Sequence, residues 1–148
     1  MGAGFPAAAE RIRVERARLG VRALDVLTAR DPTLRDRLGE TGLRALLRDT
    51  DVYLERVARA VASGDPGQLA EWTDWVVPAY RRRKVPLDDL IALGEAMGEV
   101  LGGVLGPDER VPADAAIAQA RKVLRWHRRI AGDARRRNRV LAAIYRGA

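Results

Sequence analysis

The chain has 148 residues, of which 47% are hydrophobic, and this matches the commonest size of a single domain with one core. It contains no cysteine, which excludes disulfides, thiolate catalysis and thiolate metal sites and suits a reducing compartment. The formal net charge of +7 comes mostly from arginine and favours anionic partners. Nucleic acid, acidic lipid, an acidic protein surface and a propionate-bearing tetrapyrrole fit this charge equally well, and a GC-rich genome is an alternative source of the arginines.

Two observations bear on location. The small, apolar stretch Met1 to Ala9 lacks a basic n-region, and no run approaches the ~20 apolar residues that span a bilayer. We therefore expect a cytoplasmic, soluble protein without a membrane-spanning segment, organised as one domain over residues 1–148.

Apolar residues recur at helical spacing almost everywhere, and no stretch alternates with period two for long, so the predicted fold class is all-α. A first helix is expected from Pro6 to Ala29, with a break near Gly20. Asp31-Pro32 predicts an N-cap followed by proline at the first helical position of a short segment that ends at Gly39.

The next helix carries an apolar stripe and ends at Ser63-Gly64, where glycine supplies the C-terminal cap. Its stripe consists of Leu43, Leu46, Leu47, Leu54, Val57 and Val61. Asp65-Pro66 restarts the chain as an N-cap and N1 pair, and Pro78 is expected to kink or interrupt the helix that follows. That helix places Leu69, Trp72, Val76 and Tyr80 on one face.

Pro86 begins another helix, with Asp88 and Asp89 in its first turn. Its expected buried face consists of Leu87, Leu90, Ile91, Met97, Leu101 and Val104. After a loop from Gly106 to Pro112, the longest helix is predicted from Ala113 to Tyr145. At ~1.5 Å per residue it would measure ~45 to 50 Å, which exceeds the width of a compact domain of this size. Its end is therefore expected to pack on a partner or to project.

The residues that could carry catalysis do not form a known arrangement. His127 is the only histidine and Ser63 the only serine, so neither an ordinary zinc site nor a Ser-His-Asp triad is favoured. We predict that His127 is a partly buried or interfacial imidazole beside an apolar stripe of Val123, Leu124, Ile130 and Ala134. Glu95 and Glu99 are best interpreted as a solvated face, and no phosphate-binding glycine loop follows a strand. The expectation is a protein with no catalytic residues and no metal site.

Two local patterns mark a candidate ligand site. Gly94, Gly98 and Gly102 recur every fourth residue, which favours close helix packing and, as an alternative, a ligand groove. Trp72, Trp75 and Tyr80 precede the run Arg81 to Lys84, and aromatic rings beside cations can stack bases or hold a tetrapyrrole. The simpler interpretation, which we favour, is a core Trp72 with a solvated basic helix end. A second basic segment is expected to be solvated surface; it comprises Arg125, Arg128, Arg129, Arg135, Arg136, Arg137 and Arg139.

The stretch from Asp51 to Pro66, followed by Trp72, Trp75, Tyr80 and Lys84-Val85-Pro86-Leu87, resembles the helical sensor domains of bacterial signalling proteins. These include the haem-free, globin-like N-terminal domains of stressosome co-antagonist proteins and related modules beside cobalamin-binding domains. The resemblance covers about residues 43–105. It implies a globin-like bundle in which the helices containing Leu43, Trp72, Leu87 and His127 correspond to globin helices E, F, G and H.

The resemblance also implies what such a domain would bind. No histidine lies on the Trp72 helix, so ordinary proximal haem ligation is not expected. Globin-like relatives include bilin-binding proteins, and without cysteine any bilin here would be noncovalent. The candidate ligand-binding residues are Trp72, Trp75, Tyr80, Arg81, Arg82, Gly94 and Gly98.

The expected function is a non-enzymatic regulatory or sensory domain that transmits the binding of a ligand or of a signalling-protein partner through its long last helix. The resemblance implies a homodimer that uses the last two helices. Output would come from another polypeptide or from a longer protein of which this sequence is a piece. The alternative is a basic, helical nucleic-acid-binding protein, although no helix-turn-helix spacing supports it.

Overall fold

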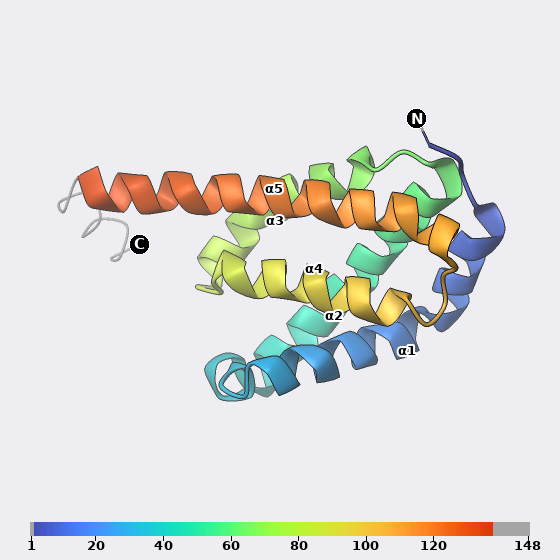
Figure 1. Cartoon of the computed structure of the whole chain (residues 1–148). Helices are drawn as coiled ribbons and strands as arrows, with labels where there is room; N and C mark the ends of the chain where they lie inside the picture. The colour runs from blue at the N-terminus through green and yellow to red at the C-terminus, as the bar shows by residue number, and fades with distance from the viewer. Residues whose placement is uncertain (1, 138–148) are drawn as a thin grey trace.

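The computed structural model describes the chain from Gly2 to Arg137, with side chains as far as Ile130. It contains five helices (Figure 1): α1 (Pro6–Arg30), α2 (Leu34–Ser63), α3 (Gly67–Arg82), α4 (Leu87–Leu101) and α5 (Pro107–Arg137). No strand occurs between Gly2 and Arg137, so the all-α prediction is confirmed. None of the helices in this part of the chain combines the length and the apolar character needed to cross a membrane.

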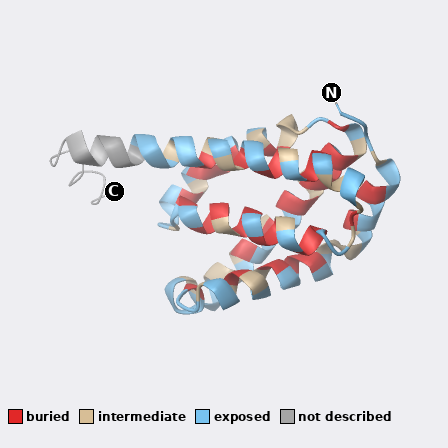
Figure 2. Cartoon of the chain, in the orientation of Figure 1, coloured by how far each residue is buried: buried red, intermediate tan, exposed pale blue. Residues whose placement is uncertain are grey.

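The helices pack around one continuous core. α1 lies against α2 and α4, while α5 contacts α2, α3 and α4. Buried residues occupy the first half of α5, whereas its later turns are mainly exposed (Figure 2). The 31 residues of α5 correspond to ~46 Å of helix. The helix extends past the ends of its neighbours (Figure 1), as predicted for the last helix.

The helix boundaries at the glycine signals agree with the sequence, whereas α2 and α3 begin at Leu34 and Gly67, two and one residues after the predicted first helical positions Pro32 and Pro66. Gly39 has φ 67° and ψ 178°, a backbone conformation that interrupts α2. Gly64 has φ 77°, and its N–H donates to the carbonyl of Ala60 at 2.8 Å, which caps the end of α2. The carboxylate of Asp65 accepts from the N–H of Gly67 at 3.0 Å and so initiates α3. These boundaries depend on local chemistry, which explains why the sequence predicts them.

Three boundary predictions were wrong. α5 begins at Pro107 and includes Pro112, because Gly106 to Glu109 form a complete helix start: proline stands at N1, and the N–H of Gly106 donates to Glu109 Oε1 at 2.8 Å. α1 continues through Gly20, which is buried where a Cβ would lie 3.3 Å from Thr50 Cγ2. α3 is likewise not interrupted at the exposed Pro78 and continues as far as Arg82, while a kink at Pro78 stays a prediction.

Most of the predicted buried faces are confirmed, with two exceptions. Leu47 is exposed beside a shallow groove between α1 and α2, and Ile130 is exposed because it lies beyond Leu124, the last buried residue among the described side chains of α5. Val26, Leu43, Val104 and Val123 are only partly buried. Ala134 lies outside the described side chains.

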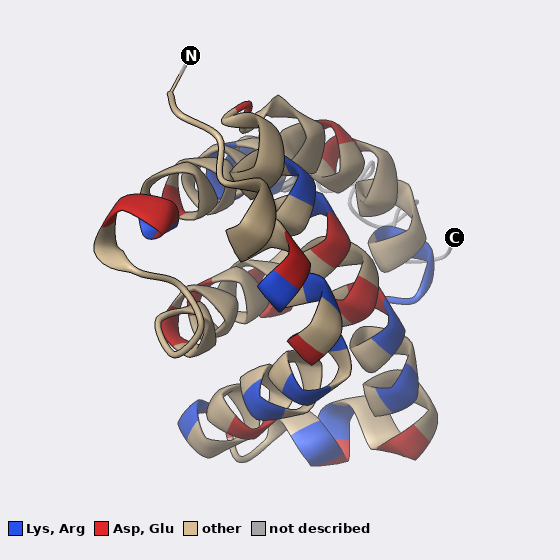
Figure 3. Ribbon diagram, turned by 90° about the vertical axis from the view of Figure 1, so that its right-hand side faces the viewer, with Lys and Arg blue, Asp and Glu red and all other residues tan. Residues whose placement is uncertain are grey.

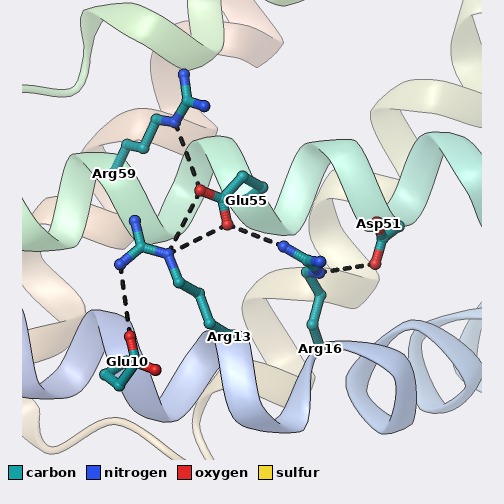
Figure 4. A network of polar contacts seen from close by, with 6 residues as sticks. All are labelled: Glu10, Arg13, Arg16, Asp51, Glu55 and Arg59. Carbon is teal, nitrogen blue, oxygen red and sulfur yellow. Dashed lines mark hydrogen bonds and ion pairs between the residues drawn. The ribbon is translucent and has the colours of Figure 1, made fainter.

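A network of ion pairs joins α1 to α2 (Figure 4). Glu55 of α2 accepts from Arg13 Nε at 3.2 Å and from Arg16 Nη1 at 2.9 Å, both on α1. Arg16 also pairs with Asp51 at 2.8 Å, and Arg59 approaches Glu55 from the same helix at 3.5 Å. One carboxylate therefore receives three guanidinium groups where the two helices meet.

This network makes part of the stability dependent on pH. Partial burial raises the pKa of Glu55, but hydrogen bonds from Arg13 and Arg59 and the charges of Arg13 and Arg16 outweigh it, so the net pKa lies below the ordinary 4.5. A lowered pKa in the folded state contributes stability above pH 4.5 that is lost as the pH falls through the folded value. Glu55→Gln should therefore lower the free energy of unfolding by ~1 kcal/mol at neutral pH.

Urea unfolding at pH 7 and pH 3 tests this expectation, because the difference between Glu55→Gln and the wild type should narrow in acid. Glu95→Gln is the matched control, since Glu95 is exposed and has no ion pair among the described side chains. An equal difference at both pH values would contradict the role assigned to Glu55.

Candidate functional site

An open groove of about 490 Å³ lies between α2 and α3. Its lining residues are Val52, Arg56, Glu71, Trp72 and Trp75. The groove forms because Val52 and Arg56 are one turn apart on α2, while the two tryptophans are three residues apart on α3 and so point to neighbouring directions. Trp75 is 77% exposed, which is unusual for an indole, whereas Trp72 is buried.

The floor of the groove connects to the core through Tyr53. The ring of Trp72 meets the ring of Tyr53 edge-on, with centroids 5.8 Å apart and an angle of 84° between the planes. Tyr53 is fully buried, and burial raises the pKa of its phenol well above 10, although the charge of Arg121 opposes this shift. The phenol is therefore neutral at any physiological pH.

The glycine row of α4 lies under Tyr53 and against α5. A Cβ at Gly94 would stand 2.7 Å from Tyr53 Oη and 3.6 Å from Ile117 Cγ2. A Cβ at Gly98 would meet only Ile117 Cδ1, at 3.9 Å, and one at Gly102 would approach Arg110 Nη1 at 3.1 Å. Protein side chains thus occupy the space beside Gly94, which is the position of the row where α2, α4 and α5 come close together.

Tyr80 belongs to a separate polar cluster. Its hydroxyl donates to Asp49 Oδ2 at 2.8 Å, and Arg83 donates to the same oxygen at 3.0 Å while its guanidinium lies 4.6 Å from the centre of the Tyr80 ring. Burial and the charge of Asp49 raise the pKa of Tyr80, so this hydroxyl also stays protonated. Arg81 donates to the carbonyl of His127 at 3.3 Å, and Arg82 is exposed.

Six of the seven candidate ligand-binding residues thus divide into three groups, and Arg82 is exposed outside them. Trp72 and Trp75 share the groove, Tyr80 and Arg81 contact α2 and α5 instead, and Gly94 and Gly98 lie in the α4 contacts. The sequence reasoning missed Arg56 and Glu71, which supply the charges of the groove.

His127 joins α5 to α3. Its Nε2 lies 2.6 Å from Asp74 Oδ1, its side chain is 16% exposed, and it packs edge-on against Trp126. The prediction of a partly buried imidazole is confirmed. Glu95 and Glu99 are both exposed, and Glu99 pairs with Arg30. Within the described part of the chain, no three His, Asp or Glu side chains gather as metal ligands.

The groove offers binding chemistry. Two indoles provide flat apolar surface, and Arg56 can stack on an aromatic ring or form a bidentate pair with a carboxylate. Glu71 adds a hydrogen-bond acceptor on the α3 side. In comparisons with known proteins, no protein-family model and no curated protein matches the chain.

Proposed function

We propose that this protein is a non-enzymatic regulatory domain that binds an effector in the groove between α2 and α3 and transmits the binding to α5. The observation that carries the proposal is a continuous series of packing contacts that runs from the groove to the last helix. Trp72 forms the groove floor and touches Tyr53, Tyr53 lies on Gly94, and Gly94 lies beside Ile117 of α5.

In this series of contacts, one side chain cannot move without displacing the next. Interiors are close-packed, so a shift of the Trp72 ring requires Tyr53 to follow, and Tyr53 is held at its hydroxyl end by the backbone of α4. Arg121 supports the same route, because its charge acts on Tyr53 and its Nε is buried without a hydrogen-bond partner among the described residues. A displacement of Tyr53 would therefore also change the surroundings of the Arg121 side chain on α5.

The effector that fits the groove best is a flat, anionic, aromatic molecule, and we propose a noncovalent bilin. Its rings would lie on Trp75 and Trp72, and one propionate would pair with Arg56. In the globin-like correspondence, which is part of this proposal, α2 and α3 are helices E and F, between which globins hold their tetrapyrrole. Because the groove is open, one face of the ligand would remain in water, and the expected Kd is on the order of micromolar.

A visible absorption titration with biliverdin, haem and cobalamin tests the effector. We expect a saturable, stoichiometric change with biliverdin that Trp75→Ala and Arg56→Gln each weaken at least ~tenfold, the value of a lost contact of ~1.4 kcal/mol. Val14→Ala is the control, because Val14 is exposed on α1 and lies neither in the groove nor in the apolar strip of α5. No spectral change, or equal binding by Trp75→Ala, would refute the bilin site.

The proposal includes a homodimer. Trp126 and Ile130 are 52% and 47% exposed at i, i+4 on α5, where they form an apolar strip that has no cover in the described structure. Light scattering of the titrated samples should give a dimer that replacement of both residues by serine converts to monomer. A monomeric wild type would remove this part of the proposal.

A further inference from the structure

The positive charge of the protein is concentrated at one end of its longest helix. Residues 121–148 contain ten of the 27 Lys and Arg residues but one of the 20 Asp and Glu residues, a net charge of +9. Residues 1–120 therefore carry a net charge of −2, although the whole chain carries +7. The excess of cations belongs to the second half of α5 and the residues that follow it.

In the rest of the bundle, cations and anions neutralise one another. Arg37 forms a two-pronged pair with the buried Asp89, with N–O distances of 3.0 and 3.1 Å, and also contacts Asp31 at 2.7 Å. Arg83, which follows α3, pairs with Asp49 of α2 through a single contact at 3.0 Å. Figure 3 views the bundle from the right-hand side of Figure 1, and basic and acidic residues are interspersed over the helices that it shows. These arginines are committed to contacts between helices.

The second half of α5 has two distinct sides. His127 and Arg128 attach it to Asp74 of α3 and Asp88 of α4. Lys122, Arg125 and Arg129, by contrast, are exposed and have no ion pair with any side chain up to Ile130. At 100° per residue these three lie within about 60° of one another, on the side of the helix opposite the buried Ala120. They form a basic strip that faces solvent.

We propose that this strip, Lys122, Arg125 and Arg129, binds the phosphodiester backbone of nucleic acid without reading its sequence. Cations three and four residues apart on a helix are neighbours, and each one that contacts a phosphate releases condensed counterions. Guanidinium groups match phosphate oxygens in a bidentate manner. This inference is independent of the proposed function, because the strip lies on a different element from the α2–α3 groove.

An acidic membrane is the competing polyanion, and the apolar side of α5 argues against it. A helix that lies on lipid needs an apolar face along its length. The apolar face of α5 is buried in the protein core as far as Leu124, and only Trp126 and Ile130 are exposed among the large apolar side chains of residues 121–130.

Fluorescence anisotropy with a labelled DNA duplex of about 20 base pairs, at several salt concentrations, tests the proposal. The full chain is compared with the triple variant Lys122→Gln, Arg125→Gln and Arg129→Gln. The matched control, Arg22→Gln, Arg35→Gln and Arg48→Gln, removes the same charge from three exposed arginines of α1 and α2. We expect the α5 variant to bind the duplex at least ~tenfold more weakly than the wild type. The plot of log K against log salt should also become less steep by about 2 to 3, because each lost phosphate contact reduces the magnitude of its slope by ~0.9.

The control variant should reduce the magnitude of this slope by less than about 1. Equal losses in both triple variants would show that net charge acts without a localised strip and would overturn the proposal. So would a wild type that does not bind the duplex. Sedimentation with phosphatidylserine-containing vesicles tests whether the strip binds an acidic membrane instead. Binding to these vesicles without binding to DNA would likewise refute the nucleic-acid assignment.

Discussion

Trp72→Ala is expected to lower the free energy of unfolding by about 3 to 5 kcal/mol, whereas Trp75→Ala should change it by less than about 0.5 kcal/mol. The two indoles are three residues apart on one helix and line one groove, but Trp72 is 7% exposed and Trp75 77%. Removing Trp72 deletes a buried ring and its edge-on contact with Tyr53, and it leaves a cavity above the core. Removing Trp75 deletes surface that is already in water.

Urea unfolding followed by circular dichroism measures both values, and biliverdin binding then separates stability from function. Trp75→Ala should be as stable as the wild type yet bind biliverdin poorly. If Trp75→Ala were strongly destabilised, the indole would be part of the core, and a surface site at this position would be untenable. If Trp72→Ala cost less than about 1 kcal/mol, its contact with Tyr53 could not transmit anything.

Gly94→Ala and Gly98→Ala should change stability in opposite directions, although both replace a glycine in the interior of α4. Alanine raises helix propensity by ~1 kcal/mol at either position. At Gly94 the added methyl would stand 2.7 Å from Tyr53 Oη, and the buried ring must move, which typically costs ~1 to 3 kcal/mol. At Gly98 the nearest atom is 3.9 Å away, an ordinary contact. The net difference between the variants should be about 2 kcal/mol in favour of Gly98→Ala.

Thermal and urea unfolding of the two single variants gives this difference directly. The Gly94 variant should also change the fluorescence of Trp72, because Tyr53 cannot shift without altering its edge-on contact. A Gly94→Ala protein as stable as Gly98→Ala would mean that the space beside Gly94 is not filled as described. The close contact among α2, α4 and α5 would then fail as a route from the groove to the last helix.

The parts of the fold that the sequence predicts correctly depend on local chemistry. Gly39, Gly64 and Asp65 mark helix boundaries through their own backbone or side-chain preferences, and they do so in the structure. The sequence predicts that the last helix begins after Pro112, whereas in the structure Pro107 and Glu109 provide an earlier capped start. Leu47 is exposed beside the groove between α1 and α2, and Ile130 is exposed because the neighbouring helices do not extend that far; helical spacing carries no information about either.

The candidate site shows the same division. Trp72 and Trp75 could be paired from their spacing on one helix, and they share the groove. Tyr80 also lay on that helix, yet its hydroxyl pairs with Asp49, which is 31 residues earlier in the chain. Arg56 comes from a different helix and had no distinguishing sequence context. Contacts between helices, set by packing, decide which charges reach the groove.

Hydrogen–deuterium exchange of the protein with and without saturating biliverdin tests most directly whether binding in the groove is transmitted to α5. The account predicts slower exchange in α3 around Trp72 and Trp75 and also in α5 around Ile117 and Arg121, with Gly94→Ala reducing the effect in α5. Exchange that slows only in α3, with α5 unchanged, would contradict the account, because the groove would then be a binding site without an output.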